Sequence, residues 1–484
     1  MPEHVLVWFR QDLRIEDNPA LAAALKSGRP LIAVYIHAPD EEASWPAGGA
    51  SKWWLHHALE ALDRQLRMNG SSLVLRNGAS LENLQEICKT HEVSEVYWNR
   101  RYEPAIISRD AKIKKQLRSE GIGVQSFSAT LLYEPHTIQN RSGKPFRVFT
   151  PFWKHLRTLQ VETPVTVDIE KLTPATKTPL SDPLKSLELL PKIPWDKHFY
   201  QHWDPSPEAA GKIMTEFVRQ RARHYKDRRD LPAVDGTSRL SPYLHFGQLG
   251  PRQLWQALSQ AGPVDGPGEY TFLSELGWRE FAYHLLFHFP ETPEQALNRN
   301  YSQFPWQADD TYLKAWQAGQ TGYPIVDAGM RQLWQTGWMH NRVRMIAASF
   351  LVKHLLQPWQ QGARWFWDTL VDADLASNTM GWQWSAGCGA DAAPYFRIFS
   401  PMLQGAKFDA KGDYVRTWVP ELKNMPAKYI HQPWEAPRDV LKQAGVKLGD
   451  NYPAPVIDHK AGRERALAAL SENKHRVALQ NDEQ

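Results

Sequence analysis

The residues with the clearest capacity for chemistry lie in four segments of the second half of the chain. In the first, TFLSELGWREFAYHLLFHF, Glu275, Trp278 and Arg279 stand at i, i+3 and i+4, so a carboxyl group and an indole ring share one face of an expected helix. A glutamate close to an arginine is usually a solvated surface pair. A functional interpretation therefore requires a second element that turns this face into a cavity.

The second segment, GWMHNRVRMIAASF, places Asn341, Arg344 and Met345 on one helical face and Arg342 on a neighbouring one. Two arginines this close would normally lie on a solvated face. Because an apolar run follows directly, we expect at least one of them to be drawn inward and to require a carboxylate partner.

The third segment, VDADLASNTMGWQWSAG, offers such carboxylates in Asp372 and Asp374, and Asn378 and a Trp-x-Trp pair follow them. Such a pair outside a strand is more often core packing than function, and the two are about equally frequent once two acids and an Asn lie beside it. Nine of the 21 tryptophans lie between Trp306 and Trp384, a density that core packing does not require. Stacking or electron transfer therefore has to be considered.

The fourth segment, DGTSRLSPYLHFG, combines hydroxyls with an expected helix start. Thr237 and Ser238 precede Ser241, a candidate N-cap, and Pro242 would be the first helical residue. Such a helix start can bind phosphate, and Arg239 adds positive charge. Taken alone, the segment is better interpreted as an ordinary capped helix.

A fold must position these segments, and the first 130 residues predict its first part. Short apolar runs (HVLVWF, LIAVYI, SLVLR, EVYW and GVQSF) alternate with stretches of helical period, which is typical of βαβ units and a doubly wound parallel sheet. Asp17 or Asn18 can cap a helix that has Pro19 in its first turn. The turn FRQDLRIEDN has no glycine, which disfavours dinucleotide binding there.

The rest of the chain predicts two further parts. Residues 131–207 are rich in Pro, Thr and Lys without a sustained period, as in a connector. From 208 to 475 the pattern is helical, with Gly337 separating two helices, and the last dozen residues resemble a frayed tail. We therefore expect an α/β domain over 1–130, a connector, and an all-α C-terminal domain over 208–475.

Composition limits the class of protein. The 484 residues suffice for two domains and a large buried cofactor, no apolar run could span a bilayer, and the N-terminus has no signal-peptide pattern. Cys88 and Cys388 permit neither a disulfide framework nor a standard zinc site. We expect a soluble, cytoplasmic protein without a metal. With a net charge of only +4, a nucleic-acid partner would need a locally basic surface.

From VWFRQDLRIEDNPAL to RIFSPMLQGAKFD, the chain resembles the DNA photolyase and cryptochrome family, whose fold is an α/β domain, a long connector and a helical FAD domain. The resemblance implies FAD as the cofactor. It assigns Asp372 and Asp374 to positions under the flavin with Arg344 as their partner, and Asn378 to the position beside flavin N5. The other implied FAD-binding residues are Tyr225, Thr237, Ser238, Arg239, Leu240, Ser241 and Phe272.

Three positions favour repair of cyclobutane pyrimidine dimers within this family. Asn378 resembles the photolyases, whereas plant cryptochromes have Asp and insect ones have Cys at this position. Asn341 stands where enzymes specific for (6-4) photoproducts have a second His, and Trp384 stands where DASH-type proteins have Tyr. The resemblance therefore implies a lyase of the bacterial class I or class III kind, which splits dimers in duplex DNA with blue light and reduced FAD.

The resemblance also implies a pocket for the flipped dimer. Trp278 and Trp384 would form its aromatic walls, with Met345 beneath. Glu275, if protonated, would donate a hydrogen bond to a thymine carbonyl, and Asn341 would orient the bases.

Trp382, Trp359 and Trp306 match the family's three-Trp chain, which carries electrons from the surface to oxidised flavin, although each could be simple core. Most of the implied DNA contacts are to the backbone, which predicts binding that is independent of sequence and sensitive to salt. All the residues implied to contact DNA, including those of the pocket for the dimer, are Arg229, Trp278, Asn341, Arg342, Trp384, Arg397 and Gln404.

An antenna chromophore is expected in the N-terminal domain, with methenyltetrahydrofolate favoured. Bacterial enzymes that bind this folate have an Asn-Glu pair where Ala105 and Ile106 stand here, which implies a different pose. SKWWLHH (51–57) and Glu103 resemble a subgroup thought to bind folate in another way. A deazaflavin or FMN as the antenna chromophore, or an antenna site without a chromophore, are the alternatives.

Two other classes of function stay open. A cryptochrome-like blue-light sensor would share the fold, but the short stretch after QGAKFD lacks the long segment that sensors commonly append. A light-independent DNA-binding or structural protein would leave the Trp chain and the two acids unexplained. We expect a monomer that binds dimer-containing duplex DNA and no membrane.

Overall fold

The computed structural model describes residues 3–391 and 396–482, and the chain divides into two compact units. The first unit contains Met1–Arg223, Ser238–Pro290 and Val371–Ala376. The second unit contains His224–Thr237, Glu291–Leu370 and Ser377–Gln484. Each unit is therefore made of stretches that are far apart in the sequence.

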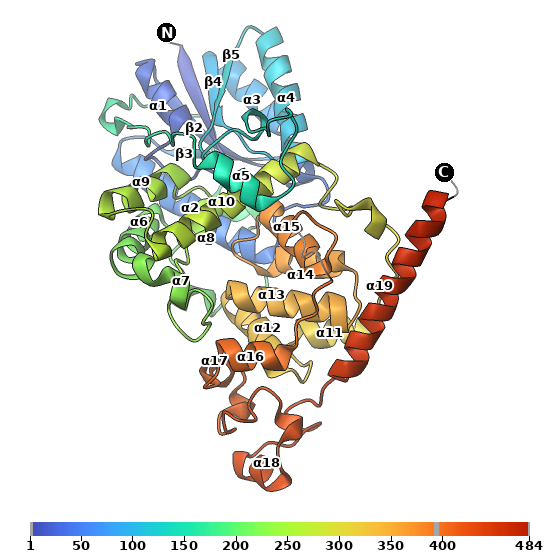
Figure 1. The fold of residues 1–484 in the computed structure, drawn as a ribbon. Helices are drawn as coiled ribbons and strands as arrows, with labels where there is room; N and C mark the ends of the chain where they lie inside the picture. The colour runs from blue at the N-terminus through green and yellow to red at the C-terminus, as the bar shows by residue number, and fades with distance from the viewer. Residues whose placement is uncertain (1–2, 392–395, 483–484) are drawn as a thin grey trace. The chain divides into compact units, whose positions relative to one another are not determined.

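A five-stranded parallel sheet forms the centre of the first unit (Figure 1). In chain order its strands are β1 (His4–Phe9), β2 (Leu31–His37), β3 (Leu73–Asn77), β4 (Val93–Asn99) and β5 (Gly123–Phe127). Their spatial order is β3-β2-β1-β4-β5, and Val7 of β1 lies between Ala33 and Tyr97. The predicted doubly wound parallel sheet is confirmed.

The crossover helices of this sheet follow from local sequence. Helix α1 (Pro19–Lys26) begins after Asn18, whose side-chain oxygen accepts a hydrogen bond from the backbone N–H of Leu21 at 3.1 Å. Of the two caps that the sequence allowed, Asn18 is therefore the one used. The longer crossovers are α2 (Gly49–Met68), α3 (Ser80–Thr90) and α4 (Pro104–Ser119).

The remaining helices of the first unit are α5 (Phe149–Leu156), α6 (Pro207–Glu216), α8 (Ser241–His245), α9 (Pro251–Ala261) and α10 (Pro267–His288). The segment predicted as a connector, 131–207, contains α5 and several short 3-10 turns and is otherwise irregular. A π-helical turn, Phe217–Arg221, extends α6.

The second unit is helical, as the sequence pattern predicts. Its helices are α7 (Tyr225–Arg228), α11 (Asp310–Gln317), α12 (Pro324–Thr336), α13 (Asn341–Ser349), α14 (Trp359–Thr369), α16 (Pro401–Phe408), α17 (Asp413–Trp418), α18 (Arg438–Ala444) and α19 (His459–Asp482). Helix α15 (Leu375–Ala386) begins in the first unit and ends in the second. Gly337 ends α12 in the left-handed conformation with φ of 67°, so the predicted break before α13 is confirmed.

The expectation of a frayed C-terminal tail is wrong. Helix α19 continues to Asp482, because one of its sides packs against the second unit. Ala466 and Ala469 are buried in a cluster with Phe304 and Leu356, and the Asn473 amide donates to the carbonyl of Asn300 at 3.0 Å.

The described residues were also compared with the requirements of a membrane span, a metal site and a disulfide. None of the helices in these ranges is long and apolar enough to cross a membrane. Within the same ranges, no group of three or more His, Cys, Asp or Glu side chains could hold a metal ion. Both cysteines, Cys88 and Cys388, are free and buried.

Candidate functional site

The predicted site residues are distributed over both units. The first unit contains Ser238, Arg239, Leu240, Ser241, Phe272, Glu275, Trp278, Asp372 and Asp374. The second contains Tyr225, Arg229, Thr237, Trp306, Asn341, Arg342, Arg344, Met345, Trp359, Asn378, Trp382, Trp384, Arg397 and Gln404.

The first unit brings Ser241 and Asp372 together, although 131 residues separate them in the sequence. The Ser241 hydroxyl donates to Asp372 Oδ2 at 2.6 Å. The prediction that Ser241 caps a helix is wrong, because α8 begins at Ser241 itself and its N-cap is Leu240, without a side-chain cap. The Ser241 hydroxyl provides a donor to the Asp372 carboxylate, which is buried and needs hydrogen-bond partners.

Asp374 lies beside Asp372 in the sequence and has two partners that the sequence analysis missed. The Tyr283 hydroxyl donates to Asp374 Oδ2, and His245 Nδ1 lies 3.5 Å from the same oxygen. Burial by itself raises the pKa of Asp374, but the hydrogen bond and charge of His245, followed by Arg279 and Tyr283, hold that pKa well below its usual range. Asp374 is therefore a buried, ionised carboxylate.

Both missed partners lie close to segments that the sequence had singled out. Tyr283 follows Arg279 by four residues and Glu275 by eight, so it lies on the same side of α10 as these two residues. His245 is the last residue of the short helix that Ser241 starts. Their spacing was visible in the sequence, but nothing there marked them as partners of an acid more than 90 residues away.

The predicted face of α10 is held by aromatic and backbone contacts. Trp278 stacks on Phe149 with ring centroids 3.6 Å apart and an angle of 9° between the ring planes. Arg279 donates to the carbonyl of Thr130 at 2.7 Å, and Glu275 is half-buried. The surface-pair interpretation of this segment is therefore wrong for Arg279, whose guanidinium is largely buried against the backbone.

Helix α10 also carries Glu280, a buried acid that the sequence analysis did not single out. Its carboxylate accepts hydrogen bonds from the backbone N–H groups of Leu132 at 3.0 Å and Tyr133 at 3.3 Å. Burial raises the pKa of Glu280 to about 7. This residue fixes the start of the segment 131–207 against α10.

In the second unit, Arg342 has a carboxylate partner that the sequence did not indicate. Its Nε and Nη2 atoms donate to the two oxygens of Asp230, at 3.2 and 2.8 Å, and its guanidinium lies 4.4 Å from the ring centre of Phe408. Arg344 donates instead to the carbonyl of Met339 at 2.7 Å. The expectation that an arginine of this segment is drawn into a carboxylate contact is confirmed for Arg342.

The start of α13 depends on His340. Its Nδ1 accepts a hydrogen bond from the backbone N–H of Arg342 at 3.2 Å, so His340 is the N-cap, whereas its neighbour Asn341 is exposed. Burial lowers the pKa of His340 to about 4. The ring is therefore neutral near physiological pH, which leaves Nδ1 able to accept.

This cap predicts a dependence of stability on pH. Below about pH 6.5 an unfolded chain protonates His340, whereas the folded chain does so only near pH 4, so the free energy of unfolding falls by up to about 3 kcal/mol over this interval. His340→Asn keeps an efficient cap that does not titrate. We expect urea unfolding at pH 7 and pH 5 to show a smaller loss for the variant than for the wild type. Equal losses would contradict the assignment.

The three predicted electron-transfer tryptophans lie in the second unit and differ in exposure. Trp382 and Trp359 are each 2% exposed, whereas Trp306 is half-buried. The Trp382 ring packs on Phe366 with ring centres 5.0 Å apart, and a side chain on Gly362 would lie only 2.1 Å from it. Glycine at 362 is therefore required by the closeness of α14 to the Trp382 ring.

The same packing relates Trp382 to the other two tryptophans. Trp359, Gly362 and Phe366 stand at i, i+3 and i+7, so Trp359 lies on the face of α14 that contacts Trp382. The segment of Trp306 is tied to the residues just before α14, since Gln307 N–H donates to the carbonyl of Leu356 at 2.8 Å. The order Trp382, Trp359, Trp306 thus runs from a buried ring to a partly exposed one.

Asn378 and Trp384, on α15, have local partners in the second unit. The Asn378 amide donates to the carbonyl of Ala363 at 3.0 Å, which fixes the orientation of the side chain. Trp384 is half-buried and lies 6.5 Å from Phe399, measured between ring centres.

Among the remaining predicted residues, Thr237, Ser238 and Arg239 carry polar side chains. Thr237 and Ser238 are half-buried, and Arg239 is exposed with φ of 55°, a left-handed conformation uncommon outside glycine. The hydroxyls of Thr237 and Ser238 and the guanidinium of Arg239 are groups that can bind a phosphate. Tyr225 and Phe272 are buried, Met345 and Gln404 are half-buried, and Arg397 is exposed.

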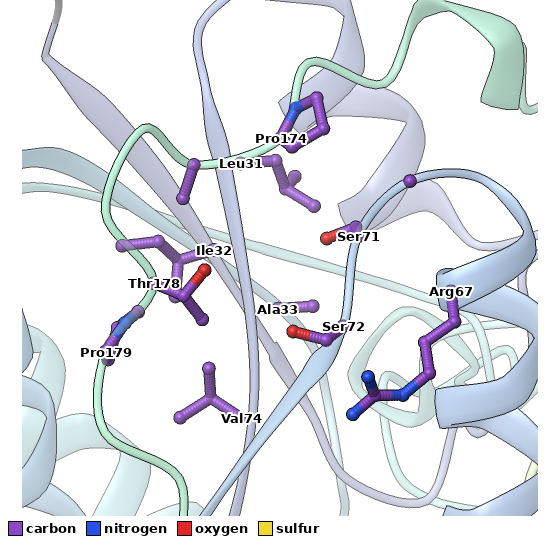
Figure 2. A pocket seen from close by; sticks show the side chains of 12 residues that line it. Leu31, Ile32, Ala33, Arg67, Ser71, Ser72, Val74, Pro174, Thr178 and Pro179 are labelled. Atoms are coloured by element: carbon purple, nitrogen blue, oxygen red, sulfur yellow. The ribbon is translucent and has the colours of Figure 1, made fainter.

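A pocket of about 200 Å³ in the first unit contains none of the predicted site residues (Figure 2). It lies beside the first residues of β2 and β3, where Pro174 and Arg67 contribute to its lining. Ligands of open α/β sheets usually bind at the carboxyl ends of the strands, which is the opposite edge.

Comparison with known proteins identifies relatives over nearly the whole chain. The family described as DNA photolyase matches residues 5–170, and the family described as FAD binding domain of DNA photolyase matches residues 272–472. A deoxyribodipyrimidine photo-lyase of Agrobacterium fabrum is 50% identical, covering 96% of this chain and 97% of its own. Cryptochrome-2 of Arabidopsis thaliana is 40% identical, covering 98% and 80%.

The fold agrees with these relationships. The crystal structure of a bacterial class III photolyase from Agrobacterium tumefaciens matches with a TM-score of 0.93 and 49% identity, covering 98% of each chain.

Proposed function

Since the chain belongs to the DNA photolyase family, we propose that it is a deoxyribodipyrimidine photo-lyase that splits cyclobutane pyrimidine dimers in light. The observation that carries this proposal is 50% identity to a photo-lyase over 96% of the chain. Asn378, Asn341 and Trp384 support it, because in the family that the sequence resembles they differ from the residues of cryptochromes, (6-4) enzymes and DASH-type proteins, respectively.

FAD, when bound and reduced, would supply the electron that opens the cyclobutane ring under blue light. Thr237, Ser238, Arg239 and Ser241 would bind the phosphates and the ribityl chain of FAD, and their hydrogen-bond donors support that role. Asp372 and Asp374 would accept hydrogen bonds from the cofactor, and Arg344 is proposed as a further cofactor-binding residue. Asp374 is suited to this because its partners Tyr283 and His245 keep it ionised. Tyr225, Leu240 and Phe272 would contribute buried apolar surface.

The flipped dimer would be held by Trp278, Trp384 and Met345. Trp278 is already fixed by its stack on Phe149, so the lesion would meet a preformed wall. Glu275, one turn before Trp278, would donate a hydrogen bond to a thymine carbonyl on which charge develops. Asn341 is neutral and exposed at the start of α13, which suits it to orienting bases.

The DNA backbone would be contacted by Arg229, Arg342, Arg397 and Gln404. Such contacts position the duplex without reading its sequence. Arg342 is held in place by Asp230, which reduces the freedom that it would lose on binding. We propose that the protein acts as a monomer on duplex DNA in the cytoplasm, where its two free cysteines would stay reduced.

We also propose an antenna chromophore bound by the first unit, with methenyltetrahydrofolate favoured over a deazaflavin or FMN. The resemblance of SKWWLHH and Glu103 to a folate-binding subgroup supports it. Trp53 and Trp54 are fully buried in this segment and Glu103 is buried in an ion pair with Arg101, so His57 is the better candidate for contact. Chromophores released from the purified protein by heat and identified by mass would decide between these classes.

Lesion choice tests the proposed function directly. Matched duplexes containing a cyclobutane dimer or a (6-4) photoproduct are illuminated with the reduced protein and also kept in darkness. We expect restoration of the cyclobutane dimer in light only, because Asn341 cannot deliver the proton that rearrangement of a (6-4) photoproduct requires. Restoration of the (6-4) lesion with cyclobutane dimers untouched would overturn the substrate.

A blue-light sensor is the second candidate, because Cryptochrome-2 of Arabidopsis is 40% identical over 98% of this chain. The same experiment separates the two, since a sensor without repair activity would leave both lesions unchanged. Asn378 favours repair, since plant cryptochromes have an acid at that position.

Asn378→Asp should destabilise the fully reduced, anionic flavin. A carboxylate beside N5 would add like charge, and it could no longer donate to the carbonyl of Ala363. We expect less fully reduced flavin to accumulate under illumination with a reductant, measured by absorbance against wild type. Unchanged accumulation, with FAD bound in equal amount, would remove this role from Asn378.

A further inference from the structure

A buried glutamine in the second unit joins two elements that carry proposed DNA-contacting residues. Gln332, on α12, is 5% exposed. Its Oε1 accepts hydrogen bonds from the backbone N–H of His340 at 3.2 Å and from the hydroxyl of Tyr414 at 2.7 Å. One side-chain oxygen therefore links α12, the residue before α13, and α17.

The connection continues from Tyr414 to the end of α16. Asp409 follows α16 directly, and its carboxylate accepts hydrogen bonds from the backbone N–H groups of Tyr414 at 3.0 Å and Val415 at 3.1 Å. His431 Nε2 lies 2.7 Å from the carbonyl of Asp409, and a side chain on Gly405 of α16 would lie 2.4 Å from the His431 ring. The end of α16 is thus fixed to α17 and, through Tyr414, to Gln332.

This network ends at α13 and α16, the two helices that carry proposed DNA-contacting residues. His340 is the N-cap of α13, so its backbone position sets where Asn341 begins the helix. Helix α16 carries Gln404, and Arg342 of α13 lies against Phe408 at the end of α16. A lost acceptor at Gln332 would leave the N–H of buried His340 without this partner and would free the start of α13 to shift.

We infer that Tyr414 and Gln332 are positioning residues for lesion recognition, which act through His340 and Asp409 on α13 and α16. Neither is proposed to touch DNA or the cofactor. The inference rests on the proposed function, because it takes Asn341, Arg342 and Gln404 as substrate contacts. Tyr414 and Gln332 would thereby help to determine how strongly the protein prefers damaged over undamaged DNA.

The test compares Tyr414→Phe with Tyr323→Phe. Tyr323 is a matched control, since it is 1% exposed and its hydroxyl donates to the carbonyl of Ile457 at 2.7 Å, outside this network. Both variants lose one buried hydroxyl hydrogen bond, so we expect similar losses in thermal stability. Binding to dimer-containing and undamaged duplexes is measured together with repair per absorbed photon at saturating DNA.

We expect Tyr414→Phe to lower the ratio of affinities for damaged and undamaged DNA by about three- to tenfold, with flavin content unchanged. Tyr323→Phe should leave the ratio at the wild-type value. Gln332→Leu, which removes the acceptor itself, should lower the ratio at least as far. Equal ratios for Tyr414→Phe and Tyr323→Phe would overturn the inference. A wild-type protein that neither prefers nor repairs dimers would instead overturn the proposed function.

Discussion

Replacing Trp306 with phenylalanine should reduce photoreduction of oxidised flavin to the background rate, while repair by chemically prereduced enzyme stays near the wild-type level. Trp306 is the partly exposed end of the series whose other members, Trp359 and Trp382, are each 2% exposed. Its loss removes the ring through which electrons would enter from solvent. In the proposed role, the three tryptophans would reload the cofactor without contacting the lesion, so the two measurements should separate.

Trp255→Phe provides the control for this experiment. Trp255 is also half-buried, but it lies on α9 of the first unit, outside the proposed chain. Flavin absorbance under illumination with an external reductant measures photoreduction, and repair is measured after reduction with dithionite. If repair by the prereduced Trp306 variant fell as far as its photoreduction, the assignment of Trp306 would be wrong.

Glu275→Ala should lower the yield of repair by roughly tenfold or more, because it removes a donor aimed at a carbonyl on which negative charge develops. DNA binding should weaken by less than about threefold, since one hydrogen bond of many is lost. Glu275 is half-buried one turn before Trp278 on α10, so truncation leaves the stack of Trp278 on Phe149 in place. Repair per absorbed photon at saturating DNA and the dissociation constant are measured on the same duplex.

Glu275→Gln is the conservative comparison. Its amide keeps a hydrogen-bond donor without an ionisable group, so we expect it to retain more repair than Glu275→Ala. If both variants lost affinity and yield in equal proportion, Glu275 would contribute to binding and not to the chemical step.

The parts of the fold that sequence could predict are those with a local signal. The five strands follow from apolar runs of four to six residues between stretches of helical period, and Asn18 caps α1 because its side chain reaches an N–H three residues away. Gly337 was recognisable because few other residues accept its left-handed conformation.

The errors and omissions have a common physical cause, which is pairing between residues far apart in the chain. Ser241 has the residue type of an N-cap, but its acceptor, Asp372, is 131 residues away. The partner of Arg342, Asp230, is 112 residues away. The prediction of a frayed tail fails at the end of α19, where the Asn473 amide donates to the carbonyl of Asn300, 173 residues away.

The three separate stretches of the first unit constrain how the protein can be made. The sheet and its crossovers leave the ribosome first, and residues 371–376 follow roughly 10–30 s after residue 223 at ordinary rates of synthesis. Until then Ser241 and Tyr283 lack their carboxylate partners, because Asp372 and Asp374 have not yet been synthesised. The corner around Asp372 and Asp374 is thus the last part of the first unit to assemble, which delays cofactor capture until most of the chain has been translated.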